Sequence, residues 1–439
     1  VRGGTILNGD ANYLEDGAQW STIINGKENR ITGNVDAVTP GTSGGYNLIG
    51  NGSLHRIISG TTNSTILNGH HNQLISANTV SILGGRHNAI SGESNTSVIV
   101  AGQHNLINSP MVDIGSTSGV FIGAGHQNMV ISGVTSGIVG GTENYISGAT
   151  SSFIGGGTNN KITELSNFAA YAKYSSIVGG NANTIVADGH NNFIGGGYYN
   201  DIRSVSNSLI VGGASNSISQ DNSLTTIDIG FKSILGGHTN YVQGTGYDVI
   251  LGGSGNTITA DSNGNFGLIG NGRDNQLITA HEYSTILNGQ KHEVTSIYGT
   301  ILGGSGNTVN GNFGHIVGGT GNTINNTASS SAVIGCNDLT ATQPNTTYMC
   351  GLTAGTISAT TVFAWNVPQK YVDTRNYTAN VAETITHNLD TLDVVVNIWD
   401  STSDVLGKRI DATIIYTSLN TLTVELTMNK DDIKTVIIG

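Results

Sequence analysis

The sequence predicts an all-β protein: a Gly/Asn-rich parallel β-solenoid, of the β-roll type, followed by a small C-terminal β-sandwich. Three observations support this class. A short unit recurs along most of the chain. Gly fills 64 of 439 positions while charged residues make up only 10%, against about 7% Gly and about 25% charge in ordinary domains. Ile, Val and Thr recur throughout with only four Pro, which favours ordered strands joined by tight turns over disorder.

The repeat is anchored on one residue, usually Asn, counted as position 0. An apolar residue stands at −6, Gly at −3 and an apolar residue at +2, as in Ile82, Gly85, Asn88 and Ile90. Gly at −3 never varies, and successive anchors lie mostly 15 to 17 residues apart. The eighteen anchors are Asn12, Asn29, His55, Asn72, Asn88, Asn105, Asn128, Asn144, Asn160, Asn183, Asn200, Asn216, Asn240, Asn256, Asn275, His292, Asn307 and Asn322. Such self-similarity is the signature of stacked coils.

The residue types at these positions assign a local structure to each unit. Gly adopts φ > 0 without steric cost. Asn also tolerates the left-handed region, and its amide can bond to backbone or to the equivalent Asn of the next coil. We therefore expect G-x-x-N to form a turn and the apolar positions beside it to form two short strands per coil.

A second apolar pattern marks the outer face of the first strand. Position −5 is Leu, Val or Ile in thirteen units, as in Leu83 and Leu302. In the other five it is Gly, and these units carry Leu or Phe at −7, as in Phe121 and Phe153. Strands that are apolar on both sides are normally buried on both sides. We therefore expect a parallel partner chain to cover this face, in a homotrimer, although a dimer satisfies the same argument.

The chain divides into three predicted segments. Residues 1–335 form the solenoid, with inserted loops near 33–46, 109–120, 163–174 and 220–231. Residues 336–370 form a cap or connector, and residues 371–439 form the β-sandwich domain. Two cysteines in so long a chain do not make a disulfide framework, so Cys336 and Cys350 are predicted to be buried free thiols.

Three histidines form the candidate metal site. His71, His87 and His104 share position −1 on consecutive coils, so their rings should stack about 4.8 Å apart. Imidazole is a common metal ligand, but a polar, solvent-facing turn position is the favoured interpretation. No catalytic residue is assigned, because the 29 acidic residues are thinly spread and no nucleophile–base pair stands out. We expect neither an enzyme nor a cofactor, although a site formed across subunits stays open.

Exposed aromatic residues are the better candidates for binding. Tyr198 and Tyr199 fill a turn, and Tyr171 and Tyr174 lie on a predicted insertion. Aromatic side chains dominate interface hot spots and offer apolar surfaces with a polar tip. These four tyrosines are therefore predicted to contact a receptor.

Charge and hydropathy exclude two classes of partner. The net charge is −12 without a basic block, so phosphate-driven nucleic-acid binding is not expected. No run of 18 apolar residues exists, so no transmembrane segment is expected. The N-terminus starts directly on a repeat without Met or a signal region, and we interpret the chain as a fragment or a processed product.

Two parts of the chain resemble known families. The S-I-x-G-G unit over 1–335 resembles the β-roll heads of trimeric autotransporter adhesins. The end of the chain resembles the C-terminal domain of bacteriophage tail-fibre and tailspike-type virion proteins. The matching residues are Thr386-His387-Asn388-Leu389, Asp393-Val394-Val395-Val396-Asn397-Ile398-Trp399-Asp400 and Val436-Ile437-Ile438-Gly439. The family usually has Gly where Asp390 stands, which puts the geometry of that turn in doubt.

The resemblance implies an extracellular, trimeric fibre on a virion. Its partners would be other tail or capsid proteins and a receptor on the bacterial surface, either a polysaccharide or a protein. Two alternatives remain open: a tailspike that depolymerises polysaccharide, and a head fibre or capsid decoration without a receptor.

Overall fold

The computed structural model describes most of the first 350 residues and parts of the C-terminal segment. The chain divides into two compact units, residues 1–358 and 359–439. The described residues are 3–15, 17–33, 45–109, 119–164, 172–186, 189–220, 230–244, 246–259, 266–278, 282–350, 370–377, 381–386, 395–400, 412–418, 421–426 and 430–438. The four predicted insertions lie largely outside these residues, as does most of the predicted connector, and Tyr171 lies outside them as well.

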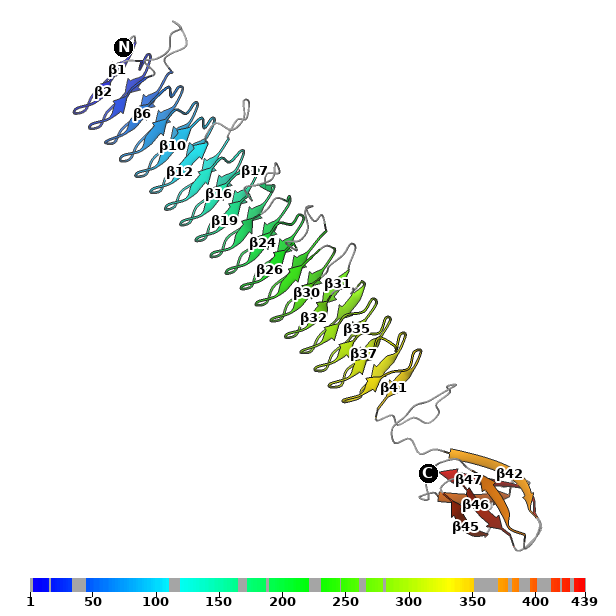
Figure 1. Ribbon diagram of the computed structural model, residues 1–439. Helices are drawn as coiled ribbons and strands as arrows, with labels where there is room; N and C mark the ends of the chain where they lie inside the picture. Colours follow the sequence, from blue (N-terminus) through cyan, green and yellow to red (C-terminus); the bar gives the residue numbers. More distant parts are fainter. Residues whose placement is uncertain are drawn as a thin grey trace. The chain divides into compact units, whose positions relative to one another are not determined.

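The first unit is a parallel β-solenoid, as predicted (Figure 1). Each coil adds one strand to each of two ladders, and neighbouring strands pair in parallel. The first ladder has 20 strands in the described residues: β1 (Thr5–Ile6), β3 (Thr22–Ile23), β5 (Leu48–Ile49), β7 (Thr65–Ile66), β9 (Ser81–Ile82), β11 (Val98–Ile99), β13 (Phe121–Ile122), β15 (Gly137–Ile138), β18 (Phe153–Ile154), β21 (Ser176–Ile177), β23 (Phe193–Ile194), β25 (Leu209–Ile210), β27 (Ser233–Ile234), β29 (Val249–Ile250), β31 (Gly267–Ile269), β33 (Ser284–Ile286), β35 (Thr300–Ile301), β37 (His315–Val317), β39 (Ala332–Ile334) and β41 (Thr347–Met349).

The second ladder runs beside the first and is built from the strands that follow each anchor. Its members are β2 (Tyr13–Leu14), β4 (Arg30–Ile31), β6 (Arg56–Ile58), β8 (Gln73–Ile75), β10 (Ala89–Gly92), β12 (Leu106–Ser109), β14 (Met129–Ile131), β16 (Tyr145–Ser147), β19 (Lys161–Thr163), β22 (Thr184–Val186), β24 (Asp201–Arg203), β26 (Ser217–Ser219), β28 (Tyr241–Gln243), β30 (Thr257–Thr259), β32 (Gln276–Ile278), β34 (Glu293–Val294), β36 (Thr308–Val309), β38 (Thr323–Ile324) and β40 (Thr340–Ala341). A short extra pair joins β17 (Ala149–Thr150) to β20 (Ala172–Lys173) in parallel. The coil therefore has two edges: the G-x-x-N edge, at positions −4 to −1, and the return edge, where the chain passes back to the first ladder.

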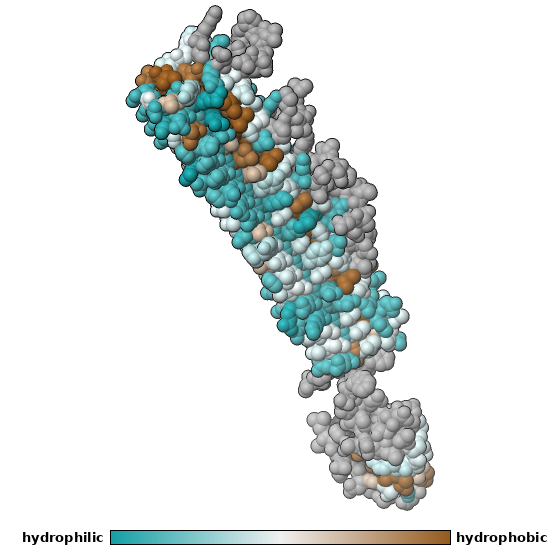
Figure 2. Space-filling model, turned by 60° about the vertical axis from the view of Figure 1, so that its left-hand side comes forward, coloured by the Kyte–Doolittle hydropathy of each residue, from teal (hydrophilic) through white to brown (hydrophobic). Residues whose placement is uncertain are grey.

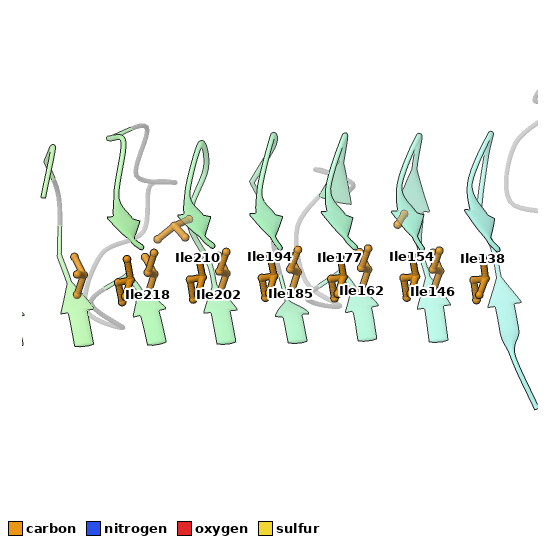
Figure 3. Close-up of a cluster of buried hydrophobic side chains, with 14 of the residues drawn as sticks. Ile138, Ile146, Ile154, Ile162, Ile177, Ile185, Ile194, Ile202, Ile210 and Ile218 are labelled. Carbon is orange, nitrogen blue, oxygen red and sulfur yellow. The ribbon is translucent and has the colours of Figure 1, made fainter. Parts of the chain in front are cut away.

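The core is a double column of aliphatic side chains between the ladders. The residue at −6 points inward from the first ladder and the residue at +2 from the second, as Figure 3 shows for Ile138 and Ile146. Both are fully buried, and so are nearly all their equivalents along the solenoid. Burying one such side chain contributes about 1.5–3 kcal/mol, so the regular spacing of these two positions in the sequence is the main determinant of the fold.

The anchor asparagines form a buried hydrogen-bonded ladder inside the G-x-x-N edge. Asn144 accepts, through Oδ1, a hydrogen bond of 3.0 Å from the backbone N–H of Asn160 on the next coil. Its amide nitrogen donates to the carbonyl oxygens of Gly140 at 2.9 Å and Gly157 at 3.0 Å. The anchor itself does not adopt the left-handed conformation that Asn tolerates. The residue before it does, as at Glu143 with φ 56°, because the anchor amide has to face inward.

The glycine at −3 fits the predicted role. Gly141 has φ 92°, and a Cβ placed there would lie 2.1 Å from the carbonyl oxygen of Gly157. Any side chain would therefore collide with the backbone of the next coil. This close approach explains why Gly at −3 is invariant in all eighteen units.

The solenoid continues beyond residue 335 in one irregular coil. Cys336 takes the −3 position and Leu339 the anchor position: Asn322 donates to the carbonyl oxygen of Cys336 at 2.6 Å and accepts from the N–H of Leu339 at 3.1 Å. The prediction of free thiols was wrong, because Cys336 and Cys350 form a disulfide. Strand β41 returns over β39 in parallel register, and this pairing brings the two thiols together.

The C-terminal unit contains two three-stranded antiparallel sheets. One has the order β42 (Lys370–Tyr377), β47 (Lys430–Ile438), β44 (Val395–Asp400), and the other β43 (Glu383–Thr386), β46 (Thr421–Glu425), β45 (Thr413–Ser418). Side chains from both sheets share one buried cluster: Ile385, Val396, Ile398, Leu422, Val424 and Leu426. This unit therefore has a core of its own.

Candidate functional site

The outer face of the first ladder is an uncharged apolar stripe. Positions −7 and −5 flank the buried −6 residue and point away from the core. Neither position holds Asp, Glu, Lys or Arg in any of the eighteen units. At −5 the side chains that are 40% to 65% exposed are Leu7, Ile24, Leu67, Leu83, Val139, Val178, Val211, Leu235, Leu251, Leu287, Leu302 and Val317. Within the part of the chain that the structure describes, these side chains stay exposed.

Phenylalanine rings continue the stripe across coils that have Gly at −5. A Cβ at Gly123 would lie 3.3 Å from the ring of Phe121, and one at Gly155 would lie 3.5 Å from the ring of Phe153. The aromatic ring at −7 therefore occupies the side of the strand that the missing −5 side chain leaves open. Phe121 and Phe153 are each 41% exposed, so the apolar surface passes from coil to coil without a break.

The outer face of the second ladder has a different character. Its outward positions carry charged side chains such as Arg30, Arg56, Lys161 and Asp201. Figure 2 shows one side of the molecule as mostly hydrophilic, with apolar patches gathered toward the N-terminal end of the solenoid. The first face therefore differs from the second in having no Asp, Glu, Lys or Arg at its outward positions, and depletion of charge is typical of the core of a contact surface between proteins.

An aromatic row runs along the return edge of the last coils, and our sequence analysis missed it. Its members are stacked on consecutive coils with ring centroids 4.8 to 5.6 Å apart. All six side chains are 39% to 56% exposed: Phe231, Tyr247, Phe266, Tyr283, Tyr298 and Phe313. Each lies at position −9 from its anchor, so this position would have revealed the row. Offset-stacked rings stabilise one another by about 0.5–1.5 kcal/mol per pair, and their free edges form a continuous apolar ridge.

The predicted binding tyrosines do not form one site. Tyr174 is 60% exposed at the return edge, where it occupies position −9. Tyr198 and Tyr199 are 48% and 55% exposed at the G-x-x-N edge, with ring centroids 4.2 Å apart. Tyr171 lies outside the described residues. The structure thus places the three described tyrosines at two different edges of neighbouring coils.

The three candidate metal histidines stack as expected. Ring centroids are 4.7 Å apart for His71 and His87, and 4.9 Å apart for the nearly parallel rings of His87 and His104. His70 and His126, at position −2, flank them at 5.8 Å from His87 and His104 respectively. In the part of the chain that the structure describes, no group of three or more His, Cys, Asp or Glu side chains is arranged to hold a metal ion.

Two side chains of opposite charge are buried on the inner side of the return edge. Lys232 and Asp248 occupy position −8 on successive coils, and both are fully buried. Other coils hold small neutral residues there, such as Ser208 and Ser284. Burial lowers the pKa of Lys232 to about 8, while the charge of Asp248 acts in the opposite direction. Asp248 also accepts a hydrogen bond of 2.8 Å from the N–H of Gly267, so the pair joins three coils.

Comparison with known proteins adds no family. No helix with the length and hydrophobicity needed to cross a membrane occurs in the described residues. No protein-family model matches the chain, and no curated protein matches its sequence.

Proposed function

We propose that this chain is the shaft and end domain of a homotrimeric extracellular virion fibre that attaches a bacteriophage to its bacterial host, with a surface glycan as the receptor. The observation that carries the proposal is the apolar stripe. A monomeric protein rarely exposes an uncharged apolar surface that continues along its whole length. The stripe repeats once per coil, so a partner surface that matches it has to repeat with the same spacing. A second copy of this chain has a surface with that spacing.

The dimensions of the stripe support a stable assembly. Twenty strands at about 4.8 Å spacing give a length of about 90 Å, and a three-residue strand adds a width of about 10 Å. The stripe therefore offers about 900 Å² per chain, compared with about 800 Å² per partner in a typical stable interface. Because each chain has one such face, three copies would direct it toward a common axis and leave both edges free.

The attachment role rests on what remains exposed outside the stripe. The aromatic row and the paired Tyr198 and Tyr199 offer rigid aromatic surface at the two edges, and aromatic side chains are enriched where binding energy concentrates. Repetition over coils and over three chains would multiply weak contacts. The Cys336–Cys350 disulfide fits an oxidising, extracellular setting. The phage assignment comes from the resemblance of the C-terminal segment to virion proteins, and the sandwich topology of that unit is proposed from its strand pattern.

Light scattering tests the assembly directly. We expect a particle of about three times the chain mass of 45.3 kDa. The double variant Leu235→Lys/Leu251→Lys, which puts two charges on the stripe, should yield monomers or aggregates because buried unpaired charges are costly. The matched control Ser217→Lys/Thr257→Lys, on the outer face of the second ladder, should remain trimeric. A monomeric native chain would contradict the proposal.

Cell binding tests the attachment role. Fluorescently labelled protein is mixed with a panel of bacterial strains, and bound fluorescence is measured with and without excess unlabelled protein. We expect saturable, competed binding to some strains and its loss after enzymatic removal of surface polysaccharide. Turnover of purified polysaccharide would instead favour the depolymerase alternative, and absence of binding to every strain tested would favour a fibre without a receptor.

A further inference from the structure

A cluster of basic side chains, which we call the histidine–arginine row, lies at the G-x-x-N edge. The row is made of six side chains at positions −2 and −1 on four consecutive coils: His70, His71, Arg86, His87, His104 and His126. The residues at position −2 form isolated parallel β-bridges from one coil to the next. The −1 residues His71, His87 and His104 all have φ between 54° and 57°. One backbone geometry therefore repeats, and it places the side chains of the row side by side.

The six side chains are close and carry one sign of charge when protonated. Neighbouring rings lie 4.7 to 6.2 Å apart. Among the described residues no ion pair involves any member of the row. The absence of ion pairs is unusual because the chain has more acidic than basic residues, with a net charge of −12. Such a strip of like charge attracts anionic ligands.

At the G-x-x-N edge, the described residues of the row's own four coils include no carboxylate; Glu93, on the second of these coils, follows β10 toward the return edge. Upstream at the same edge, Lys27 and Glu28 pair with each other at 3.5 Å, and one coil bearing Ser53 and Leu54 separates them from the row. Downstream, Glu143 lies on the coil after His126. Behind the row, His55 is buried inside the turn. A ligand that spans the row therefore meets cationic side chains along about 15 Å, the length of four coils.

Protonation of His87, at the centre of the row, is opposed in the absence of a ligand. Partial desolvation lowers the pKa of His87, and the charges of His71, His104, Arg86 and His70 lower it further. An anion lying across the rings would reverse this repulsion. Binding would then be coupled to proton uptake and would strengthen as the pH falls.

We propose that the histidine–arginine row binds an acidic polysaccharide through its repeated carboxylate groups, in a proton-linked manner. The inference rests on the proposed attachment role, of which it specifies the ligand class. A linear polymer fits because the cationic groups lie in a line at intervals of one coil. Carboxylates fit because imidazolium and guanidinium groups form charge-assisted hydrogen bonds with them.

The test measures binding of the intact chain to immobilised polygalacturonate by biolayer interferometry, at pH 5.5 and 7.5, with EDTA present to exclude metal bridges. Neutral dextran and a single-stranded DNA oligonucleotide serve as comparison ligands. We expect binding to polygalacturonate that is stronger at pH 5.5 by about tenfold or more, weakened by NaCl, and absent with dextran. Stronger binding of the oligonucleotide, or binding that does not depend on pH, would overturn the proposal.

Two variants separate the histidines from the arginine. His71→Asn/His87→Asn/His104→Asn should greatly reduce the pH dependence and leave only the contribution of His70 and His126. Asn is suited to this position, since Asn159 occupies −1 with φ 54° in another coil. Arg86→Gln should weaken binding at both pH values.

The control is Thr239→Asn, at the same turn position seven coils beyond that of His104, and it should bind like the native chain. Circular dichroism at each pH checks folding. Cell binding is scored separately: if the triple variant still binds polygalacturonate with the native pH dependence, the row is wrong even where attachment to cells is intact. If the native chain binds polygalacturonate but binds none of the bacterial strains, the attachment role is refuted while the row is supported.

Discussion

The buried imidazole of His55 accepts, through Nδ1, a hydrogen bond of 3.1 Å from the backbone N–H of Asn72 on the next coil. His292 makes the equivalent bond to the N–H of Asn307, also at 3.1 Å. The two histidines thus replace the anchor Asn only in their neutral form, because a protonated Nδ1 would point a proton at an N–H donor. Burial lowers the pKa of His55 to about 4 and lowers that of His292 as well.

This arrangement predicts acid sensitivity at defined coils. The unfolded chain takes up a proton as the pH falls below about 6.5, while folded His55 does so only near 4. The stability that depends on neutral His55 is therefore complete above pH 6.5 and is lost as the pH falls toward 4, by about 3 kcal/mol in total. His55→Asn/His292→Asn should flatten the dependence of urea denaturation on pH across this window. The exposed His238→Asn is the control, and an unchanged pH slope in the double variant would contradict the interpretation.

Removing one anchor amide should weaken the solenoid locally. Asn144→Ala deletes the acceptor for the N–H of Asn160 and two donors to backbone carbonyls. Leaving such groups buried and unpaired costs about 1–3 kcal/mol each. We expect a loss of about 3 kcal/mol or more in the free energy of unfolding, with faster hydrogen exchange in the coils around residues 137–163. The control is Asn159→Gly, at the exposed position with positive φ that precedes Asn160. It should change the free energy of unfolding by less than about 0.5 kcal/mol.

The Cys336–Cys350 disulfide should hold the last coil in place. A cross-link that closes a loop of this length contributes roughly 3 kcal/mol. Cys336→Ser/Cys350→Ser should increase hydrogen exchange over residues 332–349 and leave the coils before residue 300 unchanged. Dithiothreitol should reproduce this effect in the native chain and have no effect on the variant. Equal protection in the oxidised and reduced chains would show that the coil holds without the cross-link.

The buried pair Lys232–Asp248 should be replaceable only as a pair. Asp248→Ser removes the carboxylate that favours the charged form of Lys232, and breaking a buried pair in this way costs about 3–5 kcal/mol. The double variant Lys232→Ser/Asp248→Ser restores the residue type that other coils hold at position −8 and should recover most of the stability. Chemical denaturation of both variants measures the difference. A double variant as unstable as Asp248→Ser would show that the pair has a further structural role.

Local rules in the sequence were enough to identify the coils. Invariant Gly at −3 follows from a backbone approach that no Cβ can enter, and the paired apolar positions follow from a core two side chains wide. The coil after Asn322 escaped prediction because Cys336 and Leu339 replace the Gly and Asn that define the unit. Its backbone nevertheless keeps the same hydrogen bonds to Asn322. The disulfide escaped for the same reason, since only the register of β41 on β39 shows that the two cysteines meet.

The sequence by itself determined which residues recur at each position of the coil, and hence the parallel solenoid, its double aliphatic core and the apolar character of one outer face. These features follow from the regular spacing of the repeat, because every coil makes the same contacts with its neighbours. The tertiary structure decided which residues from different coils become neighbours. The members of the aromatic row share position −9, His70 and His126 share −2, and Lys232 and Asp248 share −8, so their positions can be counted from the anchors. Their contacts depend on whether insertions of unequal length return each coil to a common register. Spacing along the chain varies at those insertions, whereas the hydrogen-bonded ladders restore the alignment in space.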